Sequence, residues 1–335
     1  MRTQAQCIAA LPLETRLAQK IMAAGYASTL TQQAPAFADR ALGGVILMDE
    51  AGAPAVTAFK NAQKIAPFVA TDQEGGTVQR YISDGRMLGA AQMTQLSPDA
   101  AYQAYLQDFR YLASQGITTN FAPVVDVSYP GFDPLPGRMY SANPEVVTTY
   151  ATQAVKASED AGITPVIKHF PGLGSASGNT DFAPASTADL ATLKTKDFLP
   201  YQQMRGLAPD VMVNNASVPG LTNGQPASLS RAAITDTLRG QLGYKDAVVY
   251  TDSLTAAAIP GLLSDASVKA WQAGADVALF VQPAGDNSIL AAYADPIIEA
   301  GKKAVVAGTL NEDDVNASVA RILDRKGVNA CTLPT

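Results

Sequence analysis

The chain is poor in the side chains that most metal and redox sites require. Among 335 residues it has one histidine, His169, and two cysteines, Cys7 and Cys331. Zinc sites are built mainly from several His and Cys ligands, so this composition argues against one. Carboxylate oxygens alone could bind Mg²⁺ or Ca²⁺, which stays open as an alternative. We expect no metal.

Charge is also scarce. Only 16% of the residues are charged, and the net charge is −6 at pH 7. A negative surface repels phosphate backbones, and the lysines and arginines form no basic run that would hold nucleic acid or an anionic membrane. We therefore expect no nucleic-acid partner.

Two further kinds of signal are missing. No stretch reaches the ~20 consecutive apolar residues of a transmembrane helix, so stable membrane insertion is not expected. The first residues, MRTQAQCIAALPLETR, hold no apolar signal core, so the chain is expected to be cytosolic or already processed. No GxGxxG follows an apolar run and no GxxxxGK[ST] is present, so we expect no cofactor.

The two cysteines bear on the compartment. Cys7 and Cys331 each lie within a few residues of a chain end. We expect them to form a disulfide that joins the ends, which would indicate an oxidising compartment. Two unrelated thiols are the alternative. A composition rich in Ala, Thr and Gln but low in lysine favours export. We expect a secreted or cell-envelope protein, with a cytoplasmic one as the alternative.

Short apolar runs alternate with longer stretches that suit amphipathic helices. Such alternation is typical of a parallel sheet covered by helices on both faces. Eight runs predict a single-domain (β/α)₈ barrel of the TIM type over residues 1–335, which we expect to be a monomer. A doubly wound open sheet is the alternative. The predicted strands are 21–26, 43–48, 68–72, 119–126, 164–170, 210–215, 247–252 and 276–281.

Three helices are predicted from their boundaries. The stretch 97–116 begins with Ser-Pro and ends at Gly116, and 143–162 begins with Asn-Pro and ends at Gly162. These are the residues that favour helix starts and stops. The stretch 311–327 has acids first and bases last, which suits the helix dipole of a closing helix.

Polar side chains end four of the predicted strands. They are Asp72, Asp126, the Lys168-His169 pair and Asp252. In a (β/α)₈ barrel the catalytic groups lie at the C-terminal ends of the strands. A single Asp at such a place often caps the next helix, but four polar ends at one rim, with Glu74 and Asp181 nearby, predict a site. His169 has no Ser in a G-x-S-x-G elbow to work with, so paired carboxylates remain, which are the groups that cleave glycosidic bonds.

Six segments together resemble glycoside hydrolase family 3, and most of all its single-domain bacterial β-N-acetylglucosaminidases. The resemblance spans residues 14–327. The segments are ATDQEGGTVQR, NFAPVVDVS, GRMYSANPE, KHFPGLG, ASLSRAAITDTLRGQLGY and VVYTDSL, in the family's order. The pairing of K-H-F-P-G with an upstream D-Q-E-G-G is highly specific.

The resemblance implies roles for several residues. It implies that Asp252 is the nucleophile of a retaining mechanism. It also implies that a group of residues on other strands lines the pocket for the terminal sugar: Asp72, Arg80, Arg138, Lys168 and His169. Charged side chains can form strong hydrogen bonds to sugar hydroxyls. Lys168 and Arg138 are expected beside Asp252, where they would keep it ionised.

The chain departs from the family at the acid/base group. Many relatives carry Asp-x-His after K-H-F-P-G, and here those positions are Asn179 and Asp181. Two other family histidines align with Leu173 and Asn215. Asp181 is therefore expected to be the general acid/base, with its pKa raised by Phe182, Ala183, Pro184 and Asp252, on a flexible loop at 172–178.

These features predict a retaining exo-β-N-acetylhexosaminidase that acts on N-acetylglucosaminyl material from bacterial cell walls. The alternatives are a β-glucosidase or glycoside phosphorylase of the same family, or a sugar-binding barrel without activity. A phosphorylase favours a neutral acid/base because a carboxylate repels phosphate, so Asp181 favours hydrolysis.

Overall fold

Eight parallel strands form a closed barrel in the computed structural model, which describes residues 2–333. The strand order is β7-β6-β5-β4-β3-β2-β1-β8, and a parallel bridge between Tyr250 and Val277 joins the two ends of this order. The closure confirms the (β/α)₈ barrel and excludes the doubly wound sheet. The strands are β1 (Ile21–Gly25), β2 (Gly44–Leu47), β3 (Phe68–Thr71), β4 (Thr119–Asn120), β5 (Thr164–Phe170), β6 (Asp210–Val213), β7 (Val249–Thr251) and β8 (Ala278–Phe280).

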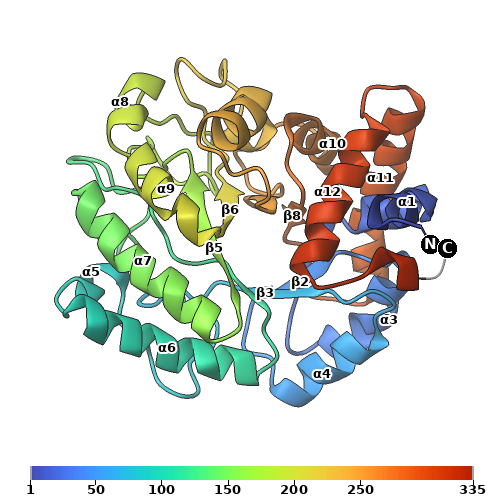
Figure 1. The fold of residues 1–335 in the computed structure, drawn as a ribbon, viewed down its shortest axis with the longest axis horizontal. Coiled ribbons are helices and arrows are strands. Elements are labelled where there is room, and N and C mark those ends of the chain that lie inside the picture. The colour runs from blue at the N-terminus through green and yellow to red at the C-terminus, as the bar shows by residue number, and fades with distance from the viewer. Residues whose placement is uncertain (1, 334–335) are drawn as a thin grey trace.

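Helices surround the strands (Figure 1). The larger ones are α3 (Leu30–Arg40), α4 (Ala53–Ala62), α6 (Pro98–Ser114), α7 (Pro144–Asp160), α10 (Leu263–Ala273), α11 (Asn287–Val306) and α12 (Glu312–Arg325). The short ones are α1 (Gln4–Ala10), α2 (Leu13–Ala18), α5 (Ala90–Met93), α8 (Leu190–Thr195), α9 (Phe198–Met204), η1 (Arg205–Leu207), η2 (Ala227–Leu229) and η4 (Ala330–Thr332). The segment η3 (Ala232–Gln241) is a π-helix.

The three predicted helices are confirmed as α6, α7 and α12, with ends within two residues of the prediction. Their starts are capped as the sequence indicated. The Ser97 hydroxyl accepts the N–H of Ala100, and the Asn143 side chain accepts the N–H of Glu145. Such caps satisfy backbone donors that have no partner within the helix.

The strands are buried on both faces because two apolar cores enclose them. One core fills the barrel interior, where the Tyr250 ring packs edge-on against Phe68 and Phe121. The other lies between strands and helices. This double burial explains why the strand sequences are continuous apolar runs rather than alternating ones.

One strand is much shorter than predicted. The run 119–126 pairs as a regular strand only over Thr119–Asn120. Past Asn120 the hydrogen bonds to β5 are irregular. The N–H groups of Val166 and Lys168 donate to the carbonyls of Ala122 and Pro123, and an isolated bridge joins Val124 to Lys168. Pro123 itself has no N–H to donate.

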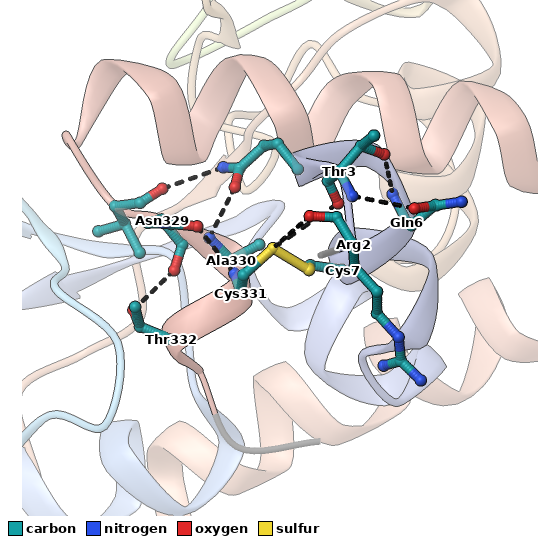
Figure 2. Close-up of a disulfide and its surroundings, with 10 residues drawn as sticks. Arg2, Thr3, Gln6, Cys7, Asn329, Ala330, Cys331 and Thr332 are labelled. Carbon is teal, nitrogen blue, oxygen red and sulfur yellow. Dashed lines mark hydrogen bonds between the residues drawn. A yellow bond between two sulfur atoms is a disulfide. The ribbon is translucent and has the colours of Figure 1, made fainter.

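The first and last helical segments, α1 and η4, meet beside α12. Cys7 in α1 forms a disulfide with Cys331 in η4, with the two Cα atoms 5.0 Å apart, as Figure 2 shows. The Gln4 side chain adds hydrogen bonds to the Val328 carbonyl and the Ala330 N–H. The predicted disulfide is confirmed, and the alternative of two unrelated thiols is wrong. Over the part of the chain described, no helix has the length and apolarity to cross a bilayer.

Candidate active site

A cavity of about 250 Å³ opens at the C-terminal ends of the strands. Strand β5 and the loops after β3, β4, β5 and β7 bring polar groups to its wall. All seven residues predicted for catalysis or sugar binding line it: Asp72, Arg80, Arg138, Lys168, His169, Asp181 and Asp252. Residues from distant parts of the sequence thus form one site.

Glu74 is the centre of the charge network on one wall. Its carboxylate oxygens lie 2.6 Å from Lys168 Nζ and 2.8 Å from Arg138 Nε. Burial alone would raise the pKa of Glu74, but the two cations outweigh burial and lower the pKa. Both oxygens are occupied by permanent donors, so Glu74 is not available as a proton donor.

Asp72 lies beside this pair and shares its lysine. Lys168 Nζ donates to Asp72 Oδ1 at 2.8 Å, and Arg80 Nη2 lies 3.6 Å from Oδ2. Burial opposes ionisation, yet the charges of Lys168 and Arg80 lower the pKa of Asp72 to about 2. The same contacts raise the pKa of Lys168 against the effect of its burial. The wall is therefore fully charged at neutral pH.

Lys168 and His169 are consecutive, yet both line the cavity. In a regular strand neighbouring side chains point to opposite faces. Here the register between β5 and β6 shifts between Ile167 and Phe170. The irregular end of β5 thus delivers two polar side chains to one place.

His169 is held from both sides. Its Nδ1 lies 2.6 Å from Asp126 Oδ2, and its Nε2 lies 3.4 Å from Arg138 Nη2. Because the guanidinium can only donate, the imidazole proton is assigned to Nδ1 and the Nε2 lone pair faces Arg138. His169 is thus fixed as an acceptor beside the cavity and is not free to shuttle a proton.

Asp252 ends β7 at the cavity wall. Its Oδ1 accepts the N–H of Ser253 at 2.7 Å, and its own N–H donates to the Val213 carbonyl. Lys168 and Arg138 line the same cavity as Asp252. Their ion pairs, however, are with acids of the loop after β3: Lys168 pairs with Asp72 and Glu74, and Arg138 pairs with Glu74. That these two cations keep Asp252 ionised stays a prediction.

Asp181 lies at the mouth of the cavity, in the loop after β5. The pKa of Asp181 is raised, first by desolvation in the mouth and second by the negative charge of Asp252. Because the residue is still solvent-exposed, the desolvation is partial. The predicted direction of the pKa shift agrees with the structure, but one predicted cause is wrong. Phe182, Ala183 and Pro184 are exposed, so they do not bury the carboxyl group.

The first half of the loop after β5, which its Gly- and Ser-rich composition predicted to be flexible, is packed against its surroundings. Residues 172–176 are buried. The Leu173 N–H donates to Asp126 Oδ1 at 2.6 Å, and a Cβ on Gly174 would lie 1.9 Å from the Val127 carbonyl oxygen. The small residues therefore serve close packing, and only the part from Ser177 to Pro184 reaches the surface.

Three polar residues of the site region were not assigned roles from the sequence. Glu74 binds the two cations, Asp126 holds His169, and Asn215 donates to the Ser253 carbonyl at 2.8 Å beside Asp252. The available signals were the spacing Asp72-x-Glu74, the place of Asp126 at a predicted strand end and the alignment of Asn215 with a family histidine. An apolar floor completes the cavity, formed mainly by Ile46, Met48, Phe121, Met212, Leu279 and Val281. Between Arg2 and Leu333, no group of three or more His, Cys, Asp or Glu side chains is placed to hold a metal.

The sequence model named "Glycosyl hydrolase family 3 N terminal domain" matches residues 14–324. The chain belongs to glycosyl hydrolase family 3. A family relative, beta-hexosaminidase LpqI of Mycobacterium tuberculosis, is 37% identical over 273 residues, which cover 78% of this chain and 68% of LpqI.

Solved structures of family 3 members share the whole architecture. A family 3 glycosyl hydrolase from Mycobacterium smegmatis is 34% identical with a TM-score of 0.84, covering 95% of this chain and 98% of its own. The β-N-acetylhexosaminidase from Beutenbergia cavernae is 28% identical with a TM-score of 0.85, covering 95% and 99%. The family 3 resemblance read from the sequence motifs is thereby confirmed.

Proposed function

We propose that this family 3 protein is an exo-β-N-acetylglucosaminidase that removes terminal β-linked N-acetylglucosamine with retention of configuration. The names of its relatives support the substrate class, since LpqI is a β-hexosaminidase and the Beutenbergia cavernae protein a β-N-acetylhexosaminidase. The cavity of about 250 Å³ suits one monosaccharide unit rather than a chain. This size supports exo action.

One observation carries the chemical part of the proposal. Asp181 and Asp252 line the same cavity, and the charge of Asp252 contributes to the raised pKa of Asp181. Two carboxyl groups with different environments are the usual pair of acid and nucleophile in glycosidases.

The proposed reaction has two steps. Asp252 attacks the anomeric carbon and forms an ester bond as the glycosidic C–O bond breaks, while Asp181 gives its proton to the leaving oxygen. Water then attacks the same carbon, its proton passes to Asp181, and the ester bond to Asp252 breaks. The sugar leaves with its original configuration, and both carboxyl groups return to their starting states.

The charged wall is proposed to hold the sugar. Asp72 and Arg80 are partly exposed in the cavity and can bind hydroxyls directly. Lys168, Arg138 and His169 complete this set, and their ion pairs keep them in fixed positions. The apolar floor suits the methyl of an acetamido group. We expect a monomer that needs no cofactor.

We further propose that the protein acts outside the cytoplasm on fragments of bacterial cell wall. The disulfide between Cys7 and Cys331 supports this location, because such bonds persist in oxidising compartments.

Rates on aryl β-glycosides of N-acetylglucosamine, glucose and xylose, each with and without phosphate, test the function. We expect the N-acetylglucosaminide to be preferred and phosphate to have no effect. A preference for glucose would indicate a β-glucosidase, and stimulation by phosphate with release of a sugar phosphate would indicate a phosphorylase. No turnover with retained sugar binding would indicate a binding protein.

A further inference from the structure

The exposed apolar side chains of the protein gather at one end of the barrel. Within residues 2–333, six large apolar residues are exposed, and five follow strands β3, β4, β5 or β7 on the face that holds the cavity. These five are Ile82, Leu88, Phe132, Phe182 and Leu262, and the sixth is Val306 at the end of α11. Phe182 is the most exposed of the five, at 81%.

Phe182 is placed directly outside the cavity. Its neighbours Asn179, Thr180 and Asp181 line the cavity, whereas Phe182 does not. The loop is fixed at this point because the N–H groups of Ala257 and Ala258 donate to the carbonyls of Asp181 and Thr180. The exposed ring therefore belongs to a loop that is tied to the neighbouring loop after β7.

The place of Phe182 outside the cavity determines which part of a substrate the ring can meet. A general acid must lie within hydrogen-bond reach of the leaving oxygen. Asp181 lines the cavity and Phe182 lies outside it, so the ring is on the side of the leaving group and not of the sugar inside the cavity. A phenyl ring at 81% exposure contributes little to folding, but it can gain free energy when a ligand covers it.

We propose that Phe182 forms a binding subsite for the leaving group and that this group is a second pyranose ring, whose C–H face stacks on the phenyl ring. This inference rests on the proposed function. The surroundings favour a sugar over a purely apolar group, because the polar Asn179 and Ser253 line the adjacent cavity mouth. A pyranose has an apolar face and a polar edge, which match this combination.

The test compares two N-acetylglucosaminides that both need a proton on the leaving oxygen. The first is a β-linked disaccharide of N-acetylglucosamine, and the second is the methyl β-glycoside, which presents no ring to Phe182. In Phe182→Ala we expect kcat/KM on the disaccharide to fall about tenfold, mainly through KM, with no change on the methyl glycoside. Phe182→Trp should retain the kcat/KM on the disaccharide, and Phe182→Leu should give a value between those of the unchanged protein and Phe182→Ala. Val306→Ala removes an equally exposed apolar side chain far from the cavity and should change neither rate.

Two results would overturn the subsite. Equal losses on both substrates would show that Phe182 acts through the position of Asp181, and unchanged rates on both would show that it contacts no leaving group. Binding to Asp252→Ala gives a second measurement that does not depend on turnover. There, Phe182→Ala should weaken the disaccharide about tenfold and leave N-acetylglucosamine unchanged. If Asp252→Ala binds N-acetylglucosamine but binds the disaccharide no more tightly than the single sugar, the subsite is refuted and the proposed function is not. If Asp252→Ala binds neither sugar, the proposed function is refuted as well.

Discussion

The backbone N–H of Ala257 donates to the carbonyl oxygen of Asp181 at 3.2 Å. Ala257 belongs to the loop that begins at Asp252, so the hydrogen bond ties the loop of the proposed acid to the loop of the proposed nucleophile. A second bond from Ala258 to Thr180 runs parallel to it. The two carboxyl groups therefore keep a fixed relation without any direct contact.

Replacement of Asp252 by Ala should abolish turnover and leave sugar binding intact, because the sugar contacts come from other strands. Calorimetry with N-acetylglucosamine measures the binding. A 2-fluoro glycosyl inactivator should label Asp252 in the unchanged protein. If mass mapping finds the label on another carboxylate, the assignment of the nucleophile is wrong.

Replacement of Asp181 by Asn should make the rate depend on the leaving group. Aryl glycosides with acidic phenols need little protonation and should still form the glycosyl-enzyme, whereas a disaccharide should lose about a hundredfold or more. Azide should restore turnover and give a β-glycosyl azide. Near-normal rates on the disaccharide, with no azide effect, would place the acid elsewhere.

The same variant should change the pH profile. Asp181 must be protonated for the first step, so kcat/KM on a disaccharide falls as the pH rises through its pKa. Since this pKa is raised, the fall should come at a higher pH than an ordinary aspartate would give. In Asp181→Asn this limb of the profile should disappear.

Removal of the Glu74 charge should destabilise the protein. Glu74→Gln leaves Lys168 and Arg138 with one fewer buried counter-charge, which costs about 3 kcal/mol or more in the free energy of unfolding. KM should rise because both cations shift. Denaturant titration measures the loss. The control is Glu299→Gln, since Glu299 pairs with Lys302 at the surface, where such a pair contributes under about 1 kcal/mol.

Asp197 should make stability depend on pH. Its burial below the loop after β5 raises its pKa to about 7, from 3.8. The folded state therefore holds the proton more tightly than the unfolded state, so the free energy of unfolding declines as the pH rises from about 4 to about 7. Burial also raises the pKa of Asp108 and Asp210 to about 7, so Asp197→Asn, which imitates the protonated form, should show a smaller decline and melt higher than the parent at pH 8. Asp246→Asn, at an exposed loop position, is the control. A parallel pH dependence of the parent and Asp197→Asn would contradict the assignment.

Loss of the disulfide should lower stability and spare activity. The bond closes nearly the whole chain, which corresponds to about 6 kcal/mol in the entropy model. Cys7→Ser with Cys331→Ser should melt on the order of 10 °C lower. Turnover at 25 °C should not change, because the bond lies where the strands begin and the cavity lies where they end. A loss of activity without a lower melting temperature would contradict this separation.

The fold was predictable because every strand is buried on both faces. An apolar run such as 43–48 needs no tertiary information to be recognised, and the same is true of helix 97–116 with its Ser-Pro start. The end of β4 was not predictable in the same way, since the apolar run continues through Pro123 to Val125 although regular pairing ends at Asn120.

The sequence predicted which residues line the site, but not which acid forms an ion pair with which cation. Strand ends placed Asp72, Lys168 and Asp252 at one rim, yet which acid each cation contacts depends on distances across the barrel. Glu74 contacts both Lys168 and Arg138, although these come from β5 and from the loop after β4. Phe182 was misassigned because local sequence does not tell on which side of a loop a ring lies.

The bond between Cys7 and Cys331 turns the chain into a covalent ring of nearly its full length. A protease that cuts one exposed loop, such as the stretch near Gly85, would therefore release no fragment, and the two parts would separate only after reduction. The same proximity makes the molecule suited to circular permutation. A short linker could join the present ends, and new ends opened at Gly85 would leave the barrel and the catalytic rim in place.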